Sequence, residues 1–345
     1  METIIYDLKD KTIYDKGITA AAEEIRRGGI VVFPTETVYG LGADATNASA
    51  VSRIFEAKGR PQDNPLIVHI AEKEDIFLAA SSLTPDAQKL ADAFMPGPIS
   101  IIVKKSPSLA ENVTAGLETV AVRMPVCPEA RDFIRAAGVP VAAPSANISG
   151  KPSPTRAEHV IKDMNGRAGV ILSGYDCVVG LESTVVDASV SPASILRPGA
   201  VTPEMISGVL GYEVRQSYRE TLKGAPKAPG MKYRHYKPEA RVICVHGDDP
   251  ELLSRFVEKT LSQAPAGSRC AAAVFDEVAV APGTAVYRLG SMHDPEEVSR
   301  QLFSALRRCD TDGITLAVVT SLPEGGIGDA FVNRLHKASD EIVYL

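Results

Sequence analysis

Paired metal-binding and redox residues are the first thing that this sequence lacks. Its 345 residues include five cysteines, and no two of them form a C-x-x-C pair. Neither H-E-x-x-H nor a cluster of His and Asp occurs, so we predict no metal site built from protein ligands. An odd number of isolated thiols is typical of a protein kept reduced in the cytosol. The cysteines are Cys127, Cys177, Cys244, Cys270 and Cys309.

Long apolar runs are absent as well. No segment approaches the roughly 20 apolar residues that a membrane-spanning helix needs. The first fifteen residues, METIIYDLKDKTIYD, are acidic and have no apolar core, so we expect no signal peptide. These features predict a cytoplasmic protein without a membrane partner.

An excess of positive charge is also missing. The formal net charge of −6 argues against a general nucleic-acid binder, because such proteins gain affinity by neutralising phosphates. Local basic clusters could still hold one nucleotide. With 45% apolar and 23% charged residues, the chain can bury hydrophobic cores, and its length suits two domains.

Three familiar catalytic motifs do not occur. The sequence has no G-x-x-x-x-G-K-[ST] phosphate loop, and YGLGAD, around Gly40 and Gly42, lacks the third glycine of a dinucleotide fingerprint. Ser145 and Ser183 lack the G-x-S-x-G elbow of a serine nucleophile. Catalysis should therefore depend on positioning and electrostatics, as in phosphoryl and nucleotidyl transfer.

The part of the chain up to residue 212 consists of short apolar runs separated by loops rich in Gly, Pro and Ser. Helical patterns fall between some of the runs, which predicts an α/β domain with an open, twisted, mixed sheet. The predicted strands are 29–33, 66–70, 100–103, 119–123, 140–143, 170–172, 184–187 and 193–196. The predicted helices are 18–27, 48–57, 85–94, 129–137 and 157–164.

Residues 213–240 differ in composition from both flanks. They contain seven Lys or Arg against three Glu, several Pro and Gly, and no apolar periodicity, which predicts a linker. Beyond it, apolar runs at 241–245, 270–275, 284–289 and 314–320 alternate with helical patterns at 250–263, 295–309 and 328–337. This alternation predicts a smaller, doubly wound parallel α/β domain over residues 241–345.

Candidate binding residues lie where the predicted strands and helices end. Lys58 and Arg60 bracket a glycine at the end of a helix, where they either complement the helix dipole or meet an anionic ligand. His69, in the run PLIVHI, is either a core histidine or a ligand contact. Arg123 ends a buried strand, and the high cost of an unpaired buried charge favours a functional role for it.

Further loops repeat this arrangement. Residues 139–155 run from a strand into small and polar side chains, among them Ser145 and Asn147, which either form an ordinary turn or approach a ligand. Ser183 and Arg197 stand at two other strand ends. Several such loops in one domain favour a shared anion site over a set of unrelated turns.

Seven motifs follow one another along the chain: FPTETVYGLGADA, KGRPQDNPLIVHI, PGPISIIVK, VAVRMP, PSANISGKPSPT, ESTVVDAS and ILRPGAV. As a set they resemble the YrdC-type threonylcarbamoyl-AMP synthases, over about residues 15–210. The tail after KYRHYKP is similar to the extra C-terminal domain of the long, two-domain form of this family.

The resemblance implies a YrdC-like sheet and a nucleotidyltransferase. Such an enzyme joins L-threonine, bicarbonate or CO2, and ATP into L-threonylcarbamoyladenylate and releases pyrophosphate. Threonylcarbamoyl-transfer proteins then use the product to form N6-threonylcarbamoyladenosine in tRNA. Mg2+ would arrive with ATP, and strong direct binding of nucleic acid is not expected.

The resemblance also implies roles for single residues. Threonine would be held by Thr35, His69, Arg123 and Ser183, with the guanidinium of Arg123 as the partner of its carboxylate. Lys58 and Arg60 would neutralise charge that develops during catalysis. The linker, with Tyr233, His235 and Tyr236, would fold over the active site. ATP would be bound by Lys58, Gln62, Thr119, Ser145, Asn147, Ser153, Arg197 and Tyr236.

Two rival functions stay open at this point. One is the related module of hydrogenase-maturation carbamoyltransferases, which sits beside acylphosphatase and zinc-finger segments, and this chain has neither the cysteine pattern nor the length for them. The other is an RNA-binding module without chemistry. The acidic total charge and the absence of an aromatic RNP-like stripe count against it.

Overall fold

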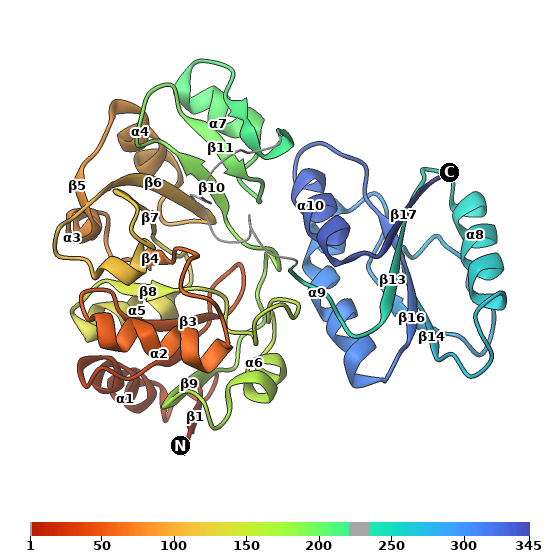
Figure 1. Ribbon diagram of the computed structural model, residues 1–345, viewed down its shortest axis with the longest axis horizontal. Helices are drawn as coiled ribbons and strands as arrows, with labels where there is room; N and C mark the ends of the chain where they lie inside the picture. Colours follow the sequence, from red (N-terminus) through yellow and green to blue (C-terminus); the bar gives the residue numbers. More distant parts are fainter. Residues whose placement is uncertain (1, 221–234) are drawn as a thin grey trace. The chain divides into compact units, whose positions relative to one another are not determined.

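The computed structural model describes residues 2–220 and 235–345, which fall into two compact units (Figure 1). The first unit holds the described chain up to residue 220, except for two short segments, 150–153 and 179–181. These two segments belong to the second unit, together with residues 235–345. Half of the predicted linker, residues 221–234 with Tyr233 among them, lies outside the described residues, so its closure over the active site stays a prediction.

A mixed sheet forms the centre of the first unit. Its strands are β1 (Ile4–Asp7), β2 (Val31–Phe33), β3 (Gly40–Asp44), β4 (Ile67–His69), β5 (Ala80–Ser82), β6 (Ile99–Lys105), β7 (Thr119–Arg123), β8 (Val141–Ala143), β9 (Val170–Ser173), β10 (Thr184–Asp187), β11 (Ser194–Arg197) and β12 (Arg215–Gln216). They follow the order β1-β9-β2-β3-β8-β4-β7-β6-β10-β11-β12, and β5 pairs with β6. Strand β4 runs parallel to β7 and antiparallel to β8, which confirms the predicted mixed sheet.

The helices of the first unit begin and end at residues suited to those positions. Asn47 accepts hydrogen bonds from two backbone N–H groups at the start of α2, and Gly59 ends that helix with φ of 61°. Thr84 caps α4, and Pro85 occupies its first turn. The five predicted helices are present; α3 and α7 were not predicted. The set is α1 (Tyr14–Arg26), α2 (Ala48–Lys58), α3 (Ile76–Ala79), α4 (Pro85–Phe94), α5 (Pro128–Ala137), α6 (Ala157–Met164) and α7 (Pro203–Leu210).

The glycine-rich stretch YGLGAD is strand β3 rather than the loop that its composition suggests. A Cβ atom on Gly40 would lie 2.7 Å from Phe33 Cζ, and one on Gly42 would lie 2.6 Å from Val141 Cγ1. Both glycines are therefore needed for close packing beneath neighbouring side chains. This agrees with the conclusion that they do not form a phosphate-binding loop.

The central strands present two different faces. Because side chains alternate along a strand, Val68, Val122 and Ile101 point into the large core of this unit. The opposite face carries a small apolar cluster of Ile67, Ile102, Ala121, Val185 and Leu196. His69 and Arg123 lie two residues beyond Ile67 and Ala121, so they share this second face and continue it toward the strand ends.

The second unit has a parallel sheet with helices on both sides. Its strands are β13 (Arg241–His246), β14 (Cys270–Val274), β15 (Ala285–Arg288), β16 (Leu316–Ser321) and β17 (Glu341–Tyr344), in the order β15-β14-β16-β13-β17. Helix α8 (Pro250–Ser262) covers one face, and α9 (Pro295–Thr311) and α10 (Gly328–Ala338) cover the other (Figure 1). The predicted doubly wound domain is confirmed, with β17 as an additional strand. Among the described residues of the chain, no helix combines the length and the apolar composition needed to cross a bilayer.

Candidate active site

Arg123 forms a buried ion pair at the end of β7. Its Nη2 atom lies 2.7 Å from Oε1 of Glu36, and the two side chains are only 5% and 3% exposed. The same Nη2 lies 3.5 Å from Oγ1 of Thr35, which in turn donates to the Val38 carbonyl at 2.6 Å. The loop after β2 is therefore held against the end of β7 by one guanidinium.

This ion pair leaves part of its hydrogen-bonding capacity unused. Nε of Arg123 and Oε2 of Glu36 are buried and have no hydrogen-bond partner among the described residues. A buried polar group without a partner costs about 1–3 kcal/mol, and such groups at the end of a strand point to a polar ligand. One N–H and one carboxylate oxygen side by side suit a ligand that carries both an anion and an ammonium group.

His69 lies beside Arg123 in the parallel β4–β7 pairing. Its Nδ1 is 3.2 Å from the Ile67 carbonyl, which can only accept, so Nδ1 carries the proton. Burial, with a further effect of the Arg123 charge, lowers the pKa of His69 to about 3. The ring of Phe33 packs edge-on against the imidazole at 5.7 Å. His69 is therefore neutral at physiological pH and lies beside Arg123 on the same face of the sheet.

Lys58, at the end of α2, is 2% exposed and points into the loop after β8. Its Nζ donates to the carbonyls of Ser145 and Asn147 at 2.5 and 2.6 Å. Oγ of Ser145 donates to Oδ1 of Asn147 at 2.5 Å. Because Ser145 also pairs with Gly40, directly across from the end of β2, this group borders the loop that carries Thr35.

Ser183 and Arg197 form a third group. Nε and Nη2 of Arg197 both donate to the Ser183 carbonyl, at 3.1 and 2.9 Å. The hydroxyl of Ser183 lies 2.8 Å from that of Ser100. Ser100 continues the β6–β7 pairing opposite Arg123, because Ile101 pairs with Val122. The four residues predicted to bind threonine therefore come from different strands and their flanking loops, and the strand pairing brings these segments together.

Other predicted residues lie further along this unit. The Nη2 atom of Arg60 makes long contacts of 3.5 and 3.4 Å with the carbonyls of Asn64 and Pro65. Gln62 lies between Arg60 and Asn64 in the sequence and is exposed. Thr119 begins β7 on the same face as Arg123, about 13 Å away at about 3.3 Å per residue.

Ser153 and Tyr236 belong to the second unit, where both are buried. Tyr236 has φ of 68°, a conformation unusual for a residue other than glycine. Its ring packs 5.1 Å from that of Phe303 on α9. The predicted contacts of Ser153 and Tyr236 with ATP stay predictions.

Three residues that this geometry singles out were not predicted from the sequence. Glu36 lies within the quoted motif FPTETVYG, but its partner Arg123 is far away in the sequence, so the ion pair left no local signal. Asn64 is fully buried, and neither Nδ2 nor Oδ1 of its amide has a hydrogen-bond partner among the described residues. Ser100 lies within the quoted PGPISIIVK. Its place in a strand expected to be apolar concealed its contact with Ser183.

Comparison with known proteins decides the family. A family model described as "Telomere recombination" matches residues 23–199, and one described as "Threonylcarbamoyl-AMP synthase, C-terminal domain" matches residues 201–340. The sequence is 44% identical to the threonylcarbamoyl-AMP synthase of Pyrococcus abyssi, with 98% of each chain covered. The chain belongs to the threonylcarbamoyl-AMP synthase family.

Other relatives and solved structures agree with this family. The threonylcarbamoyl-AMP synthase of Bacillus subtilis is 42% identical, over 94% of this chain and 93% of that one. A crystal structure of Pyrococcus abyssi Sua5 complexed with L-threonine matches with a TM-score of 0.89 and 40% identity, over 100% of this chain and 99% of that chain. The chain is therefore an enzyme of the two-domain threonylcarbamoyl-AMP synthase type, whose family function is the N6-threonylcarbamoyladenosine modification of tRNA. This decides against both rival functions.

Proposed function

We propose that this enzyme binds L-threonine at Arg123, Glu36 and Thr35, and joins it to CO2 or bicarbonate and to ATP. The buried Arg123–Glu36 pair is the observation that carries the proposal. It combines an N–H donor and a carboxylate oxygen that no described residue uses. A zwitterionic amino acid offers both complementary groups on one carbon atom.

In this arrangement each end of threonine has a defined partner. The carboxylate accepts from the guanidinium of Arg123, whose planar fork matches two oxygens. The amine lies near the free oxygen of Glu36. The neutral imidazole of His69 and the hydroxyls of Thr35 and Ser183 supply hydrogen bonds without adding charge.

ATP is bound around the remaining cations and hydroxyls of the first unit. Lys58 makes strong charge-assisted hydrogen bonds to two carbonyls, so it acts chiefly by holding the Ser145–Asn147 segment in place. The Nη2 atom of Arg60 contacts the Asn64 and Pro65 carbonyls at 3.5 and 3.4 Å, and its guanidinium is proposed to meet the phosphates, because a planar cation matches their oxygens. Arg197, Gln62 and Thr119 complete the proposed nucleotide contacts.

The reaction then needs no covalent enzyme intermediate. The ammonium group of threonine first loses one proton, and the neutral amine then attacks the carbon of CO2 and loses a second proton to solvent, which gives a carbamate. A carbamate oxygen attacks the α-phosphorus of ATP, and the bond from that phosphorus to the pyrophosphate oxygen breaks. The enzyme contributes positioning and fixed positive charge.

Mg2+ fits this site best as a companion of ATP. The one group of three or more metal-ligating side chains found among the described residues lies in the second unit, and Glu36 is already paired with Arg123. Carried by ATP, Mg2+ would help to neutralise the charge on the leaving pyrophosphate. Threonylcarbamoyl-transfer proteins that act on tRNA are the proposed recipients of the product.

Release of pyrophosphate tests the proposal. The purified full chain is given ATP and Mg2+, and threonine and bicarbonate are added separately and together. We expect sustained pyrophosphate release only when both are present. Release that ignores threonine or bicarbonate would contradict the assignment, as would salt-sensitive RNA binding without any release.

A further inference from the structure

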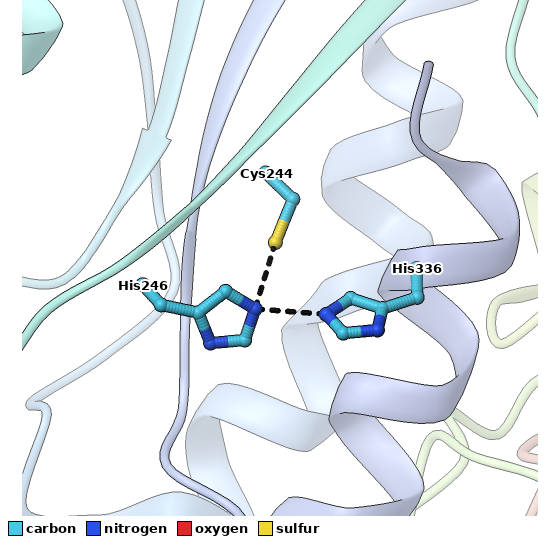
Figure 2. Close-up of side chains that lie close together, drawn as sticks. All are labelled: Cys244, His246 and His336. Atoms are coloured by element: carbon cyan, nitrogen blue, oxygen red, sulfur yellow. Dashed lines mark hydrogen bonds between the residues drawn. The ribbon is translucent and has the colours of Figure 1, made fainter. Parts of the chain in front are cut away.

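Three side chains with metal-binding atoms converge in the second unit, and none of them is among the residues proposed to bind threonine or ATP. They are Cys244, His246 and His336, and Figure 2 shows their Sγ and two Nε2 atoms pointing toward one another. All three atoms lie within 4.8 Å of each other. Cys244 is buried, and the two histidines are half-buried.

The fold explains why these residues meet. Cys244 and His246 are two residues apart on β13, so they point to the same face of the sheet. His336 lies in the last turn of α10, one of the two helices that cover this face. A fixed strand and a packed helix therefore hold all three ligand atoms in place.

The contacts within this group cannot all be satisfied as hydrogen bonds. Nε2 of His246 lies 2.8 Å from Nε2 of His336 and 3.4 Å from Sγ of Cys244. A ring nitrogen has either one proton or one lone pair, directed along one line in the ring plane. Nε2 of His246 can therefore form a hydrogen bond with only one of these two neighbouring atoms. The other atom lies close to it without a hydrogen bond between them.

We propose that Cys244, His246 and His336 bind one divalent transition-metal ion of the zinc type, with water in a fourth position. A single cation placed among the three atoms uses every lone pair at once. Two imidazole nitrogens and one thiolate are ligands that zinc prefers. Three protein ligands and one exchangeable position are a common arrangement for this ion.

Two of the three separations are close to those that a bound ion requires, and the third is at most 4.8 Å. With metal–nitrogen and metal–sulfur bonds of about 2.0 and about 2.3 Å, tetrahedral ligand atoms lie roughly 3.3–3.6 Å apart. The distance from Cys244 Sγ to His246 Nε2 already falls in this range at 3.4 Å. The two imidazoles need to separate by about half an ångström, which a small rotation of the His336 ring provides.

The surroundings of the group also suit a cation. The carboxylate of Glu324 acts electrostatically on both imidazoles. When the metal binds, it displaces the proton of the Cys244 thiol to solvent. Tyr344 stacks on His246 at 4.5 Å and 12°, which limits rotation of that ring.

One sequence feature of this group was not recognised as a metal-binding pattern. The segment ICVHG contains a C-x-H pair on an expected strand, but its third ligand lies 90 residues further on. Searches for C-x-x-C and H-E-x-x-H look for ligands within one turn or helix. The prediction that no protein-built metal site exists is therefore replaced here by this proposal.

Metal binding to the full chain tests the inference. The protein is treated with chelator, dialysed, and titrated with Zn2+ alone and with Co2+ alone under a reductant that does not bind metals. The variants are Cys244→Ser and His336→Asn. The matched controls are Cys270→Ser, on β14, and His293→Asn, in an exposed loop. Circular dichroism checks that each variant is folded.

We expect one Zn2+ per chain and a thiolate-to-cobalt charge-transfer band with Co2+. Both ligand variants should weaken Zn2+ binding at least about 100-fold, because loss of a residue that only hydrogen-bonds to a metal ligand already costs up to about 100-fold. Both controls should bind Zn2+ as the parent chain does. If Cys244→Ser does not fold, the charge-transfer band of the parent chain still reports a cysteine ligand. Absence of that band, or binding that His336→Asn leaves intact, would overturn the proposal.

Discussion

The two units bury ionisable side chains on a sheet face in opposite ways. In the first unit, Arg123 and Glu36 carry opposite charges and lie 2.7 Å apart, with neutral His69 beside them. In the second unit, the side chains of Cys244, His246 and His336 lie together. Burial raises the pKa of the thiol and lowers the pKa of both imidazoles, so it favours the uncharged form of each group. The first group therefore balances its charge within itself, and the second offers lone pairs without charge.

This difference indicates what each group can bind. A buried ion pair can bind a zwitterion at little electrostatic cost. The anion of the ligand pairs with the buried cation, and its ammonium group pairs with the buried carboxylate, so no charge is left without a partner. Neutral lone pairs gain little from an anion or a zwitterion and much from a cation. The ligand class of a buried group is thus better judged from its net charge than from the number of its polar atoms.

Replacing Arg123 should break the balance of the first group and have the largest effect. In Arg123→Met the Glu36 carboxylate is left buried without its partner, which costs about 3–5 kcal/mol of stability. Threonine also loses the partner of its carboxylate, so its KM should rise about 100-fold or more, while the KM of ATP changes little. Urea unfolding and initial rates of pyrophosphate release measure the two effects.

A double variant separates charge balance from substrate binding. Arg123→Met combined with Glu36→Gln removes both charges, so it should recover about 1–3 kcal/mol relative to the sum of the single changes. It should not recover threonine binding. Equal increases in the KM of threonine and of ATP would contradict the role of Arg123.

Lys58 offers the next largest effect and tests whether the first unit is held together by charge-assisted hydrogen bonds. In Lys58→Met the carbonyls of Ser145 and Asn147 lose donors at 2.5 and 2.6 Å, at a cost of about 1–3 kcal/mol. We expect lower stability and a reduced kcat, because the segment that borders ATP is no longer fixed. A variant with normal stability and a reduced kcat alone would instead favour direct contact of Lys58 with the phosphates. Lys89→Met, on helix α4, is a matched control.

The sequence predicted most of the fold because apolar runs and capping residues act locally. The helix predicted over residues 85–94 is α4, whose start suits Thr84 and Pro85, and the runs predicted at 66–70 and 119–123 contain central strands. Strand β3 was missed because Gly40 and Gly42 disfavour strands on their own, and only packing beneath Phe33 and Val141 explains them. Tertiary contacts outweigh local preference at such positions.

The site was predicted only where the resemblance or a strand end singled out a residue. Arg123 stood out because a charge closed a buried strand, whereas its partner Glu36 needed the fold to be seen. Asn64 was hidden because a buried amide looks like any turn residue in a sequence. Pairs that meet across distant segments leave no periodic pattern to read.

His69 allows the neutral part of the first group to be tested by pH. Its pKa is about 3 in the folded chain and about 6.5 when unfolded. Between these values the unfolded chain binds more protons, so the free energy of unfolding falls as pH falls, by at most about 1.4 kcal/mol per pH unit. His69→Asn keeps a donor for the Ile67 carbonyl and should lose this slope between pH 6 and about 4.

Urea unfolding at several pH values measures the slope for the parent chain, His69→Asn and His293→Asn. The exposed control should behave as the parent does, since its imidazole is in solvent. A parent chain whose stability is flat over this range would show that His69 accepts a proton in the folded state. The first group would then carry excess positive charge, and its contrast with the second unit would weaken.

Thr119 gives the smallest expected effect and tests how far the ligand face extends. It shares a strand face with Arg123 but lies about 13 Å away, which suits ATP better than threonine. Thr119→Val removes one hydroxyl with little change of shape, and one neutral hydrogen bond is worth about 0.5–1.5 kcal/mol. We therefore expect the KM of ATP to rise about 2- to 10-fold, with the KM of threonine unchanged. Thr260→Val, on α8 of the second unit, should alter neither. If Thr119→Val left both KM values unchanged, the bound nucleotide would not reach Thr119 at the start of β7. The ligand-binding face of the first unit would then be confined to the strand ends near Arg123.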